Sequence, residues 1–324
     1  MLAAWYEKNG AAAEVLRVGD RPDPEPGPGD VRVRLRTSAV NPSDVKARDG
    51  SRKVIPPYVI PNSDAGGIID RVGAGIDRKR LGERVWTYNA QWQRPFGTSA
   101  QWVALPAALA VPLPDVLDFD AAACLGIPCM TAHRCLFAEG PVRGKVVLVT
   151  GGAGVVAHYA IQMAKWAGAT VVTTVSTDAK ADHARKAGAD ILINYRTQNV
   201  VDRIRSELGG VDHVVDVDFG ENLPVTAQVL KPGGVVTSYS SMRAPTPVYP
   251  YYTLHALNPV IRPVLVYSMP DAAKARAIVD IAHWCAETKP IFTIAERFAL
   301  ARIVDAHLAV ERGDKIGHVL LDIP

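Results

Sequence analysis

The sequence predicts an α/β protein in which a doubly wound parallel sheet is joined to a second, β-rich domain. From residue 145 onward, short apolar runs alternate with helical stretches, as they do when crossover helices connect the strands of a parallel sheet. Before residue 115, short strand-like runs are separated by turns rich in Gly, Pro and Asn, which is typical of a β domain. A length of 324 residues is enough for two domains.

The β-rich part begins with a Pro- and Gly-rich loop at 21–29, followed by strict alternation of apolar and basic residues at 31–35. That alternation indicates a half-buried strand. Further strands are predicted at 67–72, 84–87 and 101–104. The stretch 119–138 is rich in Ala, Leu and Cys and predicts a helix, with Asp118 or Asp120 as its N-cap.

The second part contains the alternating pattern, and its last segments return to strand character. The predicted strands are 146–149, 170–175, 191–194, 211–217, 235–238 and 318–321, and the predicted helices are 155–167, 183–187, 200–208, 224–230, 272–286 and 300–309. Because the final strand can rejoin the β-rich domain, we expect residues 1–117 with 263–324 to form that domain and residues 118–262 to form the parallel-sheet domain.

Charge and hydropathy limit the possible partners. The 36 Lys and Arg nearly balance the 33 Asp and Glu, and no long run of like charges occurs, so neither nucleic acid nor an anionic membrane is indicated. No apolar stretch of about 18 residues suggests a membrane span, and we expect a cytoplasmic protein. The four cysteines, Cys124, Cys129, Cys135 and Cys285, lack zinc-ligand spacing and are predicted to be reduced and buried.

A dinucleotide-binding turn is the strongest chemical feature. Gly152-x-Gly154-x-x-Ala157 fits the G-x-G-x-x-G/A fingerprint, and it lies between a predicted strand and a predicted helix. Glycines allow the backbone to approach a pyrophosphate, and the helix N-terminus offers unpaired N–H groups. The predicted contacts to the cofactor in this turn are Gly151, Gly152, Ala153, Gly154, Val155 and Val156.

The end of the following strand indicates which dinucleotide binds. Sites that prefer NAD usually place Asp or Glu there, to accept from the ribose hydroxyls. Here the strand ends in Ser176 and Thr177, with Lys180 close behind. Hydroxyls and an ammonium attract a 2′-phosphate, so NADPH is the predicted cofactor. The alternative is that Lys180 is a solvated helix residue whose charge is partly offset by Asp178.

Several longer motifs accompany this turn. They are Asn41-Pro42-Ser43-Asp44, Pro61-Asn62-Ser63-Asp64, Ile127-Pro128-Cys129-Met130-Thr131-Ala132-His133, Ile193-Asn194-Tyr195, Lys231-Pro232-Gly233-Gly234, Ala306-His307 and Gly317-His318-Val319-Leu320. With them the chain resembles, over nearly its whole length, the zeta-crystallin-like quinone oxidoreductases, a zinc-free branch of the medium-chain dehydrogenase/reductases. The resemblance implies a Rossmann nucleotide domain and a GroES-like catalytic domain.

The resemblance also implies residue roles. Lys180 and Tyr195 match residues that hold the 2′-phosphate of the cofactor in the family, and Ser240 and His318 match further cofactor contacts. Two departures stand out. Val155 and Ala157 replace the usual glycines of the turn, and His318 replaces the usual basic residue.

The resemblance further implies a metal-free site. Zinc-dependent relatives ligate their metal with Cys, His and Glu at the positions of Asn41, Ser63 and Asp64. Because Asn and Ser are poor zinc ligands, we expect no metal. Without a metal as Lewis acid, the expected reaction is hydride transfer to an acceptor that is already electrophilic.

The predicted catalytic residues surround such an acceptor. Asn41 and Thr131 are expected to line the nicotinamide or acceptor site, and Asp44 and Asp64 to orient Asn41 or nearby backbone N–H groups. Tyr58 is a further candidate beside the substrate. A purely structural role remains open for each of them. Trp92 and Phe96 are predicted either to form an aromatic wall for a planar acceptor or simply to pack on the surface.

Three functions remain open on the sequence. The first is NADPH-dependent reduction of a quinone, and the second is NADPH-dependent reduction of an activated C=C bond in an alkenal, enone or enoyl compound. The third is a non-enzymatic role as a crystallin or RNA-binding protein, which the absence of a basic patch disfavours. The apolar, Tyr-rich segment 249–266 predicts a homodimer formed by edge-strand pairing, or alternatively a buried intrachain segment.

Overall fold

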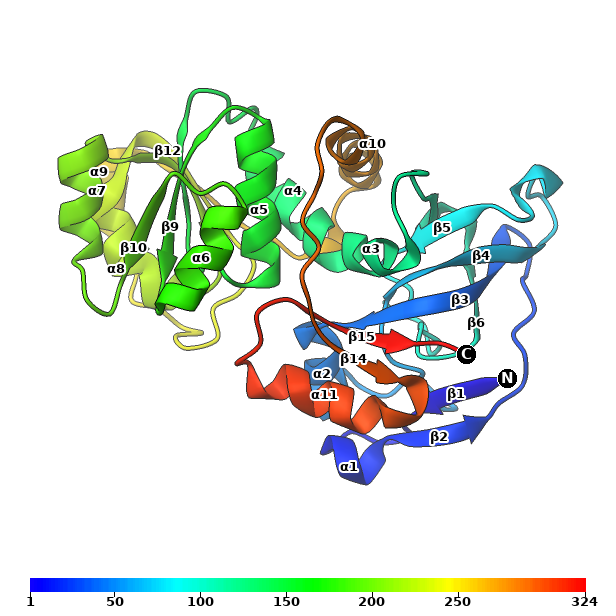
Figure 1. Cartoon of the computed structure of the whole chain (residues 1–324). Helices are drawn as coiled ribbons and strands as arrows, with labels where there is room; N and C mark the ends of the chain where they lie inside the picture. The colour runs from blue at the N-terminus through cyan, green and yellow to red at the C-terminus, as the bar shows by residue number, and fades with distance from the viewer. The chain divides into compact units, whose positions relative to one another are not determined.

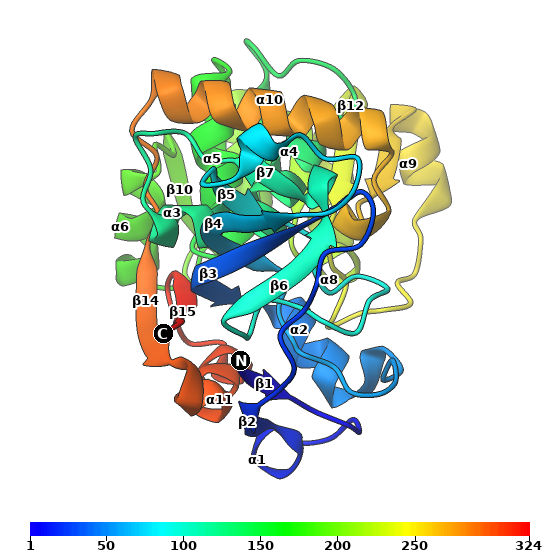
Figure 2. The ribbon, with the colours of Figure 1, turned by 90° about the vertical axis from the view of Figure 1, so that its right-hand side faces the viewer.

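The computed structural model describes all 324 residues, which form two compact units (Figure 1). Unit 1 contains residues 1–127 and 292–324, and unit 2 contains residues 128–291. The chain passes from one unit to the other after residues 127 and 291, later than the predicted boundaries after residues 117 and 262. Helix α3 (Phe119–Cys124) packs on the sheet of unit 1, and helix α10 (Asp271–Glu287), seen along its length in Figure 2, packs on helix α4 (Met130–Phe137) of unit 2. Helical periodicity identifies these helices but not the surface on which they pack.

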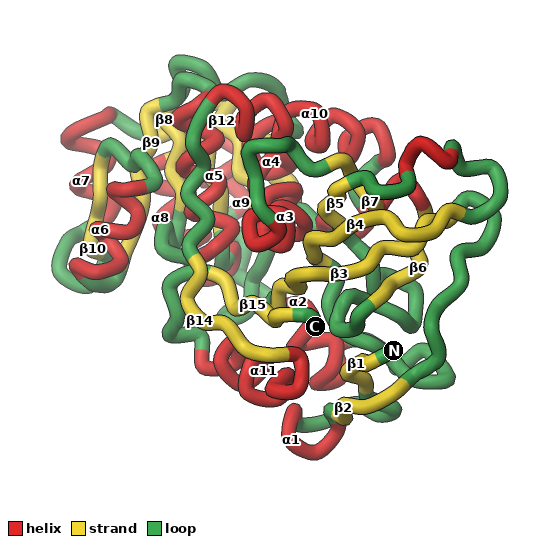
Figure 3. Tube along the Cα trace, turned by 45° about the vertical axis from the view of Figure 1, so that its right-hand side comes forward, coloured by secondary structure: helices red, strands yellow, loops and turns green.

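Unit 1 is built around a seven-stranded sheet with the order β14-β15-β3-β4-β5-β7, in which β6 also pairs with β3. Its strands are β3 (Asp30–Val40), β4 (Asp64–Val72), β5 (Arg84–Thr87), β6 (Trp102–Pro106), β7 (Ala110–Pro112), β14 (Ile294–Ala299) and β15 (His318–Asp322). The pairs are antiparallel except β14 with β15. Because β15 pairs with β3, the C-terminal segment joins a sheet made mainly by the N-terminal part (Figure 3).

The alternation in β3 explains its burial. Val31, Val33 and Leu35 enter the core of unit 1, together with residues of α11 (Ile303–Arg312). Arg32 is also buried, because its guanidinium donates to both carboxylate oxygens of Asp70 at 2.9 and 2.8 Å. The remaining elements of unit 1 are β1 (Leu2–Trp5), β2 (Arg17–Asp20), α1 (Ala12–Val15) and α2 (Pro42–Lys46).

Unit 2 contains a six-stranded, entirely parallel sheet with the order β10-β9-β8-β11-β12-β13. The strands are β8 (Val146–Val149), β9 (Thr170–Val175), β10 (Ile191–Asn194), β11 (Val211–Asp216), β12 (Leu230–Ser238) and β13 (Val260–Pro263). The helices are α4, α5 (Val155–Trp166), α6 (Asp178–Lys186), α7 (Val200–Leu208), α8 (Phe219–Val229), α9 (Tyr251–Leu257) and α10. The helices cover both faces of the sheet (Figure 1), which is why its strands are rich in buried β-branched residues.

The strand order of unit 2 reverses between β8 and β11. The chain runs from β8 outward through β9 and β10, then returns to the other side of β8 and runs outward through β11, β12 and β13. Ligands of doubly wound sheets bind at the carboxyl ends of the strands beside such a reversal. The predicted combination of a doubly wound α/β domain with a β-rich domain is confirmed. No helix combines the length and the hydropathy that a membrane span requires.

Candidate active site

The glycine turn lies at the carboxyl end of β8, beside the reversal of strand order. The Gly151 N–H donates to Thr174 Oγ1 at 3.0 Å, and the Gly152 N–H donates to the Thr174 carbonyl at 3.0 Å. The Gly154 N–H donates to the Gly151 carbonyl at 2.9 Å. Gly151 adopts φ of +67°, which favours glycine. The end of β9 therefore fixes the course of the turn.

Gly152 is required by the packing of the turn on β9. A Cβ atom built at this position would lie 2.1 Å from Thr173 Oγ1, which itself donates to the Val149 carbonyl at 2.7 Å. No side chain fits there without displacing one of the two strands. On the side that faces β9, the turn therefore has room for backbone atoms only.

Helix α5 starts directly after the turn and can receive an anion. The first N–H groups of a helix have no intrahelical partner, and here they belong to Val155, Val156 and Ala157. No acidic residue lies in the first turn of the helix. With the positive end of the helix dipole, these groups fit the pyrophosphate of a dinucleotide.

The end of β9 carries hydroxyl groups and no carboxylate. Ser176 is buried, and Thr177 caps α6 by accepting from the Lys180 N–H at 3.3 Å. The Tyr195 N–H donates to the Val175 carbonyl at 3.1 Å, so this exposed tyrosine follows β10 beside the end of β9. The predicted 2′-phosphate residues thus lie on neighbouring segments of one sheet edge.

Ser240 follows β12 at the same edge of the sheet. Its carbonyl accepts from the Phe219 N–H at 2.9 Å and from Ser238 Oγ at 2.9 Å. These bonds join the segment after β11 to the segment after β12. Thr131 is buried on α4 of unit 2.

His318 belongs to β15 of unit 1, where it is only 4% exposed. Burial lowers its pKa to about 3, so the ring is neutral at physiological pH. It does not offer an exposed cation, and its role as a cofactor contact stays a prediction.

Asn41 is the centre of a buried polar cluster in unit 1. Its Nδ2 donates to Asp64 Oδ2 at 2.8 Å, and its backbone N–H donates to Asp44 Oδ2 at 2.8 Å. The Ile127 N–H also donates to Asp64 Oδ2, at 2.8 Å. Three of the five predicted catalytic residues are therefore in direct contact. Asp64 holds the side-chain amide of Asn41, and Asp44 holds its backbone N–H.

Both carboxyls of this cluster bind protons more readily than usual. Burial raises the pKa of Asp44 to about 7, although its hydrogen bond from Asn41 opposes the shift. Burial, and secondarily the charge of Asp44, raises the pKa of Asp64 well above its ordinary range. Two neighbouring carboxyls in a desolvated site cannot both ionise easily.

Tyr58 lies outside the Asn41 cluster, in a group of aromatic rings. Its ring centroid is 5.3 Å from that of Phe96 and 6.4 Å from that of Trp5. The Arg21 guanidinium lies 4.9 Å from the Tyr58 ring centroid. Trp92 instead has the Arg52 guanidinium 4.6 Å from its ring centroid.

The positions that bind zinc in metal-dependent relatives are engaged in hydrogen bonds. Asn41 is held by Asp64, and Ser63 Oγ accepts from the Gln91 N–H at 3.2 Å. No group of three or more His, Cys, Asp or Glu side chains is arranged to hold a metal ion. All four cysteines are buried free thiols.

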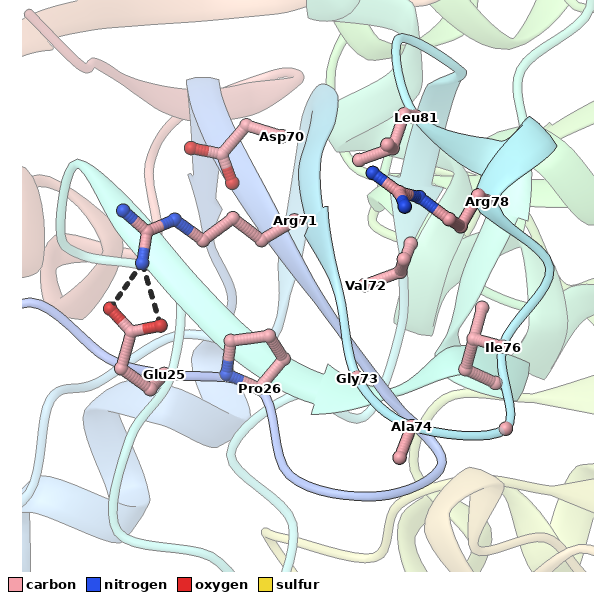
Figure 4. Close-up of a pocket in the computed structure, with 11 residues that line it drawn as sticks. Glu25, Pro26, Asp70, Arg71, Val72, Gly73, Ala74, Ile76, Arg78 and Leu81 are labelled. Carbon is pink, nitrogen blue, oxygen red and sulfur yellow. Dashed lines mark hydrogen bonds and ion pairs between the residues drawn. The ribbon is translucent and has the colours of Figure 1, made fainter.

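An open groove of about 630 Å³ lies on unit 1, and none of its lining residues is a predicted site residue (Figure 4). Glu25 accepts from Arg71 Nη1 there at 2.6 and 2.7 Å, and Asp70 accepts from Arg32 and from Trp102 Nε1. The two carboxylates of the groove are therefore already paired within the protein.

Two residues that sequence reasoning missed lie at the reversal of strand order. Thr150 follows β8 directly, and Asp216 ends β11. Thr150 Oγ1 donates to Asp216 Oδ1 at 2.9 Å. The sequence signal that could have identified them is their position at the carboxyl ends of predicted strands, because these ends face the ligand in doubly wound sheets.

Comparison with known proteins identifies the family of the chain. Residues 27–115 match the model of the alcohol dehydrogenase GroES-like domain, and residues 155–282 match that of the zinc-binding dehydrogenase family. The quinone oxidoreductase of Homo sapiens is 30% identical over 311 residues, covering 93% of this chain and 91% of that protein. The 2-haloacrylate reductase of a Burkholderia species is 30% identical, covering 99% and 98%.

Solved structures extend the comparison to the whole fold. A structure described as an NAD-dependent alcohol dehydrogenase has a TM-score of 0.89 and 28% identity, with complete coverage of both chains. A mycobacterial protein solved in complex with NADPH has a TM-score of 0.84 and 26% identity, with 99% of each chain covered. The chain therefore belongs to the medium-chain dehydrogenase/reductase family, as an oxidoreductase whose relatives include the quinone oxidoreductases.

Proposed function

We propose that this protein is a zinc-independent, NADPH-dependent oxidoreductase that transfers hydride to a quinone. The observation that carries the proposal is the glycine turn at the carboxyl end of β8, with the unpaired N–H groups of α5 beside it and no carboxylate at the end of β9. This combination favours a dinucleotide that carries an additional phosphate.

The preference for NADPH rests on the residues after β9 and β10. Ser176, Thr177, Lys180 and Tyr195 provide hydroxyl groups and an ammonium where NAD sites usually carry an acid. The similarity to the mycobacterial protein that binds NADPH supports the same choice.

The zinc-free part of the proposal rests on the chemistry of the possible ligands. Asn41 and Ser63 offer only a neutral amide and a neutral hydroxyl where a catalytic zinc needs thiolate, imidazole or carboxylate. Without such ligands, the acceptor must be electrophilic by itself, as a quinone is.

In the proposed mechanism, the reduced nicotinamide supplies a hydride when it is bound. The second N–H of the Asn41 amide, whose first is held by Asp64, donates to the acceptor oxygen that gains charge. For Thr131 the proposed role is the predicted one, lining the nicotinamide or acceptor site. The quinone takes up the hydride and a solvent proton and leaves as hydroquinone, so that catalysis depends on orientation and on electrostatic stabilisation.

A second candidate is reduction of an activated C=C bond with the same cofactor. The similarity to 2-haloacrylate reductase over nearly the whole chain favours it. In that reaction the hydride adds to the carbon β to the carbonyl and a proton adds to the α carbon. The acceptor, not the cofactor chemistry, distinguishes the two candidates.

The proposed assembly is a homodimer paired through β13. This strand ends the parallel sheet, so one of its edges has no neighbouring strand within the chain. Large apolar side chains are exposed on it and in the segments that flank it in the sequence: Val248, Tyr249, Tyr251, Tyr252, Val260 and Leu265. An uncovered strand edge with apolar surroundings favours pairing with a second copy.

The first experiment measures oxidation of NADPH and NADH by EDTA-treated protein with a benzoquinone, a naphthoquinone, an enone and a 2-alkenal. We expect NADPH turnover that chelation leaves unchanged, with a quinone as the best acceptor. A 2-alkenal or enone as the best acceptor would select the second candidate. Loss of activity on chelation, restored by zinc, would refute the metal-free proposal.

The matched variants Lys180→Ala and Lys186→Ala test cofactor preference, because both lysines lie on α6 but only Lys180 follows the end of β9 closely. We expect Lys180→Ala to raise the KM for NADPH about tenfold, corresponding to the loss of one charged contact. The KM for NADH should not change, and Lys186→Ala should change neither. Equal effects of Lys180→Ala on both cofactors would contradict the assigned role.

A further inference from the structure

We infer that Thr150 and Asp216 form a positioning pair that holds the dinucleotide turn in its binding shape. The inference deepens the proposed function and rests on it, because it concerns the same cofactor. Neither residue belongs to the fingerprint of the turn.

The pair spans the point where the strand order reverses. β8 and β11 are neighbours in the sheet, and the Thr150 N–H donates to the Val215 carbonyl at 3.0 Å. Thr150 immediately precedes Gly151, the residue with positive φ. A shift at Thr150 therefore moves the start of the turn directly.

Asp216 collects several donors on one oxygen. Its Oδ1 accepts from Thr150 Oγ1 at 2.9 Å, from the Asp218 N–H at 2.9 Å and from Asn222 Nδ2 at 2.7 Å. Thr150 Oγ1 in turn accepts from the Val217 N–H at 3.0 Å. The network joins the end of β8, the loop after β11 and the first turns of α8 through a single carboxyl.

Burial makes this arrangement costly for stability. Asp216 is 0% exposed, and its Oδ2 has no hydrogen-bond partner. A buried carboxyl with one unpaired oxygen lowers the stability of a fold. A role in positioning the turn explains why the Asp216 carboxyl is buried here despite this cost.

With this network, the turn is held by contacts from both strands that neighbour β8. From β9, Thr174 accepts from the N–H groups of Gly151 and Gly152, and Thr173 packs against Gly152. Thr150 and Asp216 hold it from β11, the other neighbour of β8. Without the second side, the N–H groups that face the pyrophosphate are oriented from β9 alone.

The test compares Thr150→Val, which removes the bridging hydroxyl at nearly constant size, with Thr150→Ser, which retains it. NADPH and NADH are each titrated into the protein by nicotinamide fluorescence, and steady-state kinetics are measured with the best acceptor. We expect Thr150→Val to raise the Kd for NADPH about tenfold, the worth of one or two hydrogen bonds. The KM for NADPH should rise by more than kcat falls, and Thr150→Ser should restore most of the affinity.

Thr237→Val is the matched control. Thr237 is as buried as Thr150, and its hydroxyl donates to the Val214 carbonyl at 3.0 Å in the same sheet. We expect a similar loss of melting temperature in the two valine variants but a loss of affinity only in Thr150→Val. Asn222→Ala, which removes another donor to Asp216, should weaken NADPH binding even if Thr150→Val does not fold.

The outcomes separate this inference from the proposed function. If the wild type binds NADPH and Thr150→Val binds it equally well, the positioning role is wrong and the proposed function stands. Equal loss of affinity in Thr237→Val, or no rescue in Thr150→Ser, would reduce Thr150 to a structural residue. If the wild type binds NADH rather than NADPH, the cofactor preference is wrong and the positioning role is decided by the NADH titration. Binding of neither cofactor would refute both.

Discussion

At the scale of single residues, the Asn41 cluster is the arrangement whose chemical role can be argued most directly. A buried amide is held by Asp64 through its side chain and by Asp44 through its backbone N–H. Both carboxyls are kept from ionising easily by burial. Such an arrangement fixes a neutral hydrogen-bond donor beside carboxyls that ionise less readily than usual, which suits stabilisation of an oxygen that becomes negative during the reaction.

Replacement of this donor tests its role. We expect Asn41→Leu to lower kcat/KM for the acceptor about 100-fold, the usual effect of losing one donor to a developing oxyanion. The change is measured at saturating NADPH. Ser38→Ala is the control, since it removes another buried hydrogen bond of unit 1, the 2.8 Å contact with Thr98 Oγ1. A loss as large in Ser38→Ala would assign Asn41 a structural role.

His307 makes stability depend on pH. It is fully buried on α11, its nitrogens have no hydrogen-bond partner, and burial, followed by the charge of Arg48, lowers its pKa from 6.5 to about 3. A lowered pKa gives stability that is present above pH 6.5 and is lost as the pH falls toward 3. Arg48, which donates to Glu311 of the same helix, keeps a positive charge beside the ring.

The variant His307→Leu removes this titration. The free energy of unfolding of the variant minus that of the wild type should be about 2 kcal/mol larger at pH 5 than at pH 7.5. The reason is that the histidine of the unfolded wild type is largely protonated at pH 5, which favours unfolding of the wild type only. Urea unfolding at the two pH values measures the difference. An identical difference between the two proteins at both pH values would show that His307 does not titrate in this way.

At the scale of elements, the packing of the glycine turn against β9 sets what the turn tolerates. Gly152 leaves no room for a Cβ atom beside Thr173, whereas a Cβ at Gly154 would lie 3.3 Å from the Gly151 carbonyl. The first contact forces two strands apart and the second needs only a small adjustment. The fingerprint glycines are therefore unequal in this chain.

Gly152→Ala should lower the free energy of unfolding by about 1–3 kcal/mol, as overpacking does, and should also weaken NADPH binding. Gly154→Ala should cost less stability. The double variant Gly152→Ala with Thr173→Ala should regain part of the loss, because it removes the Oγ1 atom that lies 2.1 Å from the new Cβ. No recovery in chemical denaturation would show that the clash lies elsewhere.

At the scale of the whole molecule, the parallel sheet of unit 2 ends in β13, whose outer edge pairs with no other strand of the chain. β13 and the segment before it expose Tyr252 at 83% and Val248 at 92%. The apolar area and the unpaired edge together favour the proposed pairing of two copies.

Val260→Glu places a charge on this strand and should convert a dimer to a monomer. Val116→Glu is the control, because Val116 is 74% exposed and belongs to unit 1, whereas β13 belongs to unit 2. Native mass spectrometry of both variants and of the wild type measures the change. A monomeric wild type, or a dimer that survives Val260→Glu, would remove the proposed interface.

The sequence by itself determined the fold class and the strongest part of the site. Periodicity and glycine spacing are local properties, so the alternating strands and helices of unit 2 and the turn at residues 151–156 could be predicted from neighbouring residues. The resemblance in the motifs correctly indicated the family, which the comparisons show. The roles of the named site residues and the identity of the acceptor remain predictions.

The tertiary structure decided how distant residues meet. The contacts of Asn41 with Asp64 and of Thr150 with Asp216 join segments 23 and 66 residues apart, and no local pattern encodes such distances. Burial also lowers the pKa of His318 from 6.5 to about 3, so its ring stays neutral at acidic pH values where an exposed histidine is protonated. Packing of α3 on one unit and α10 on the other set where the chain crosses between them. These outcomes depend on which surfaces pack together, and that is a property of the whole fold.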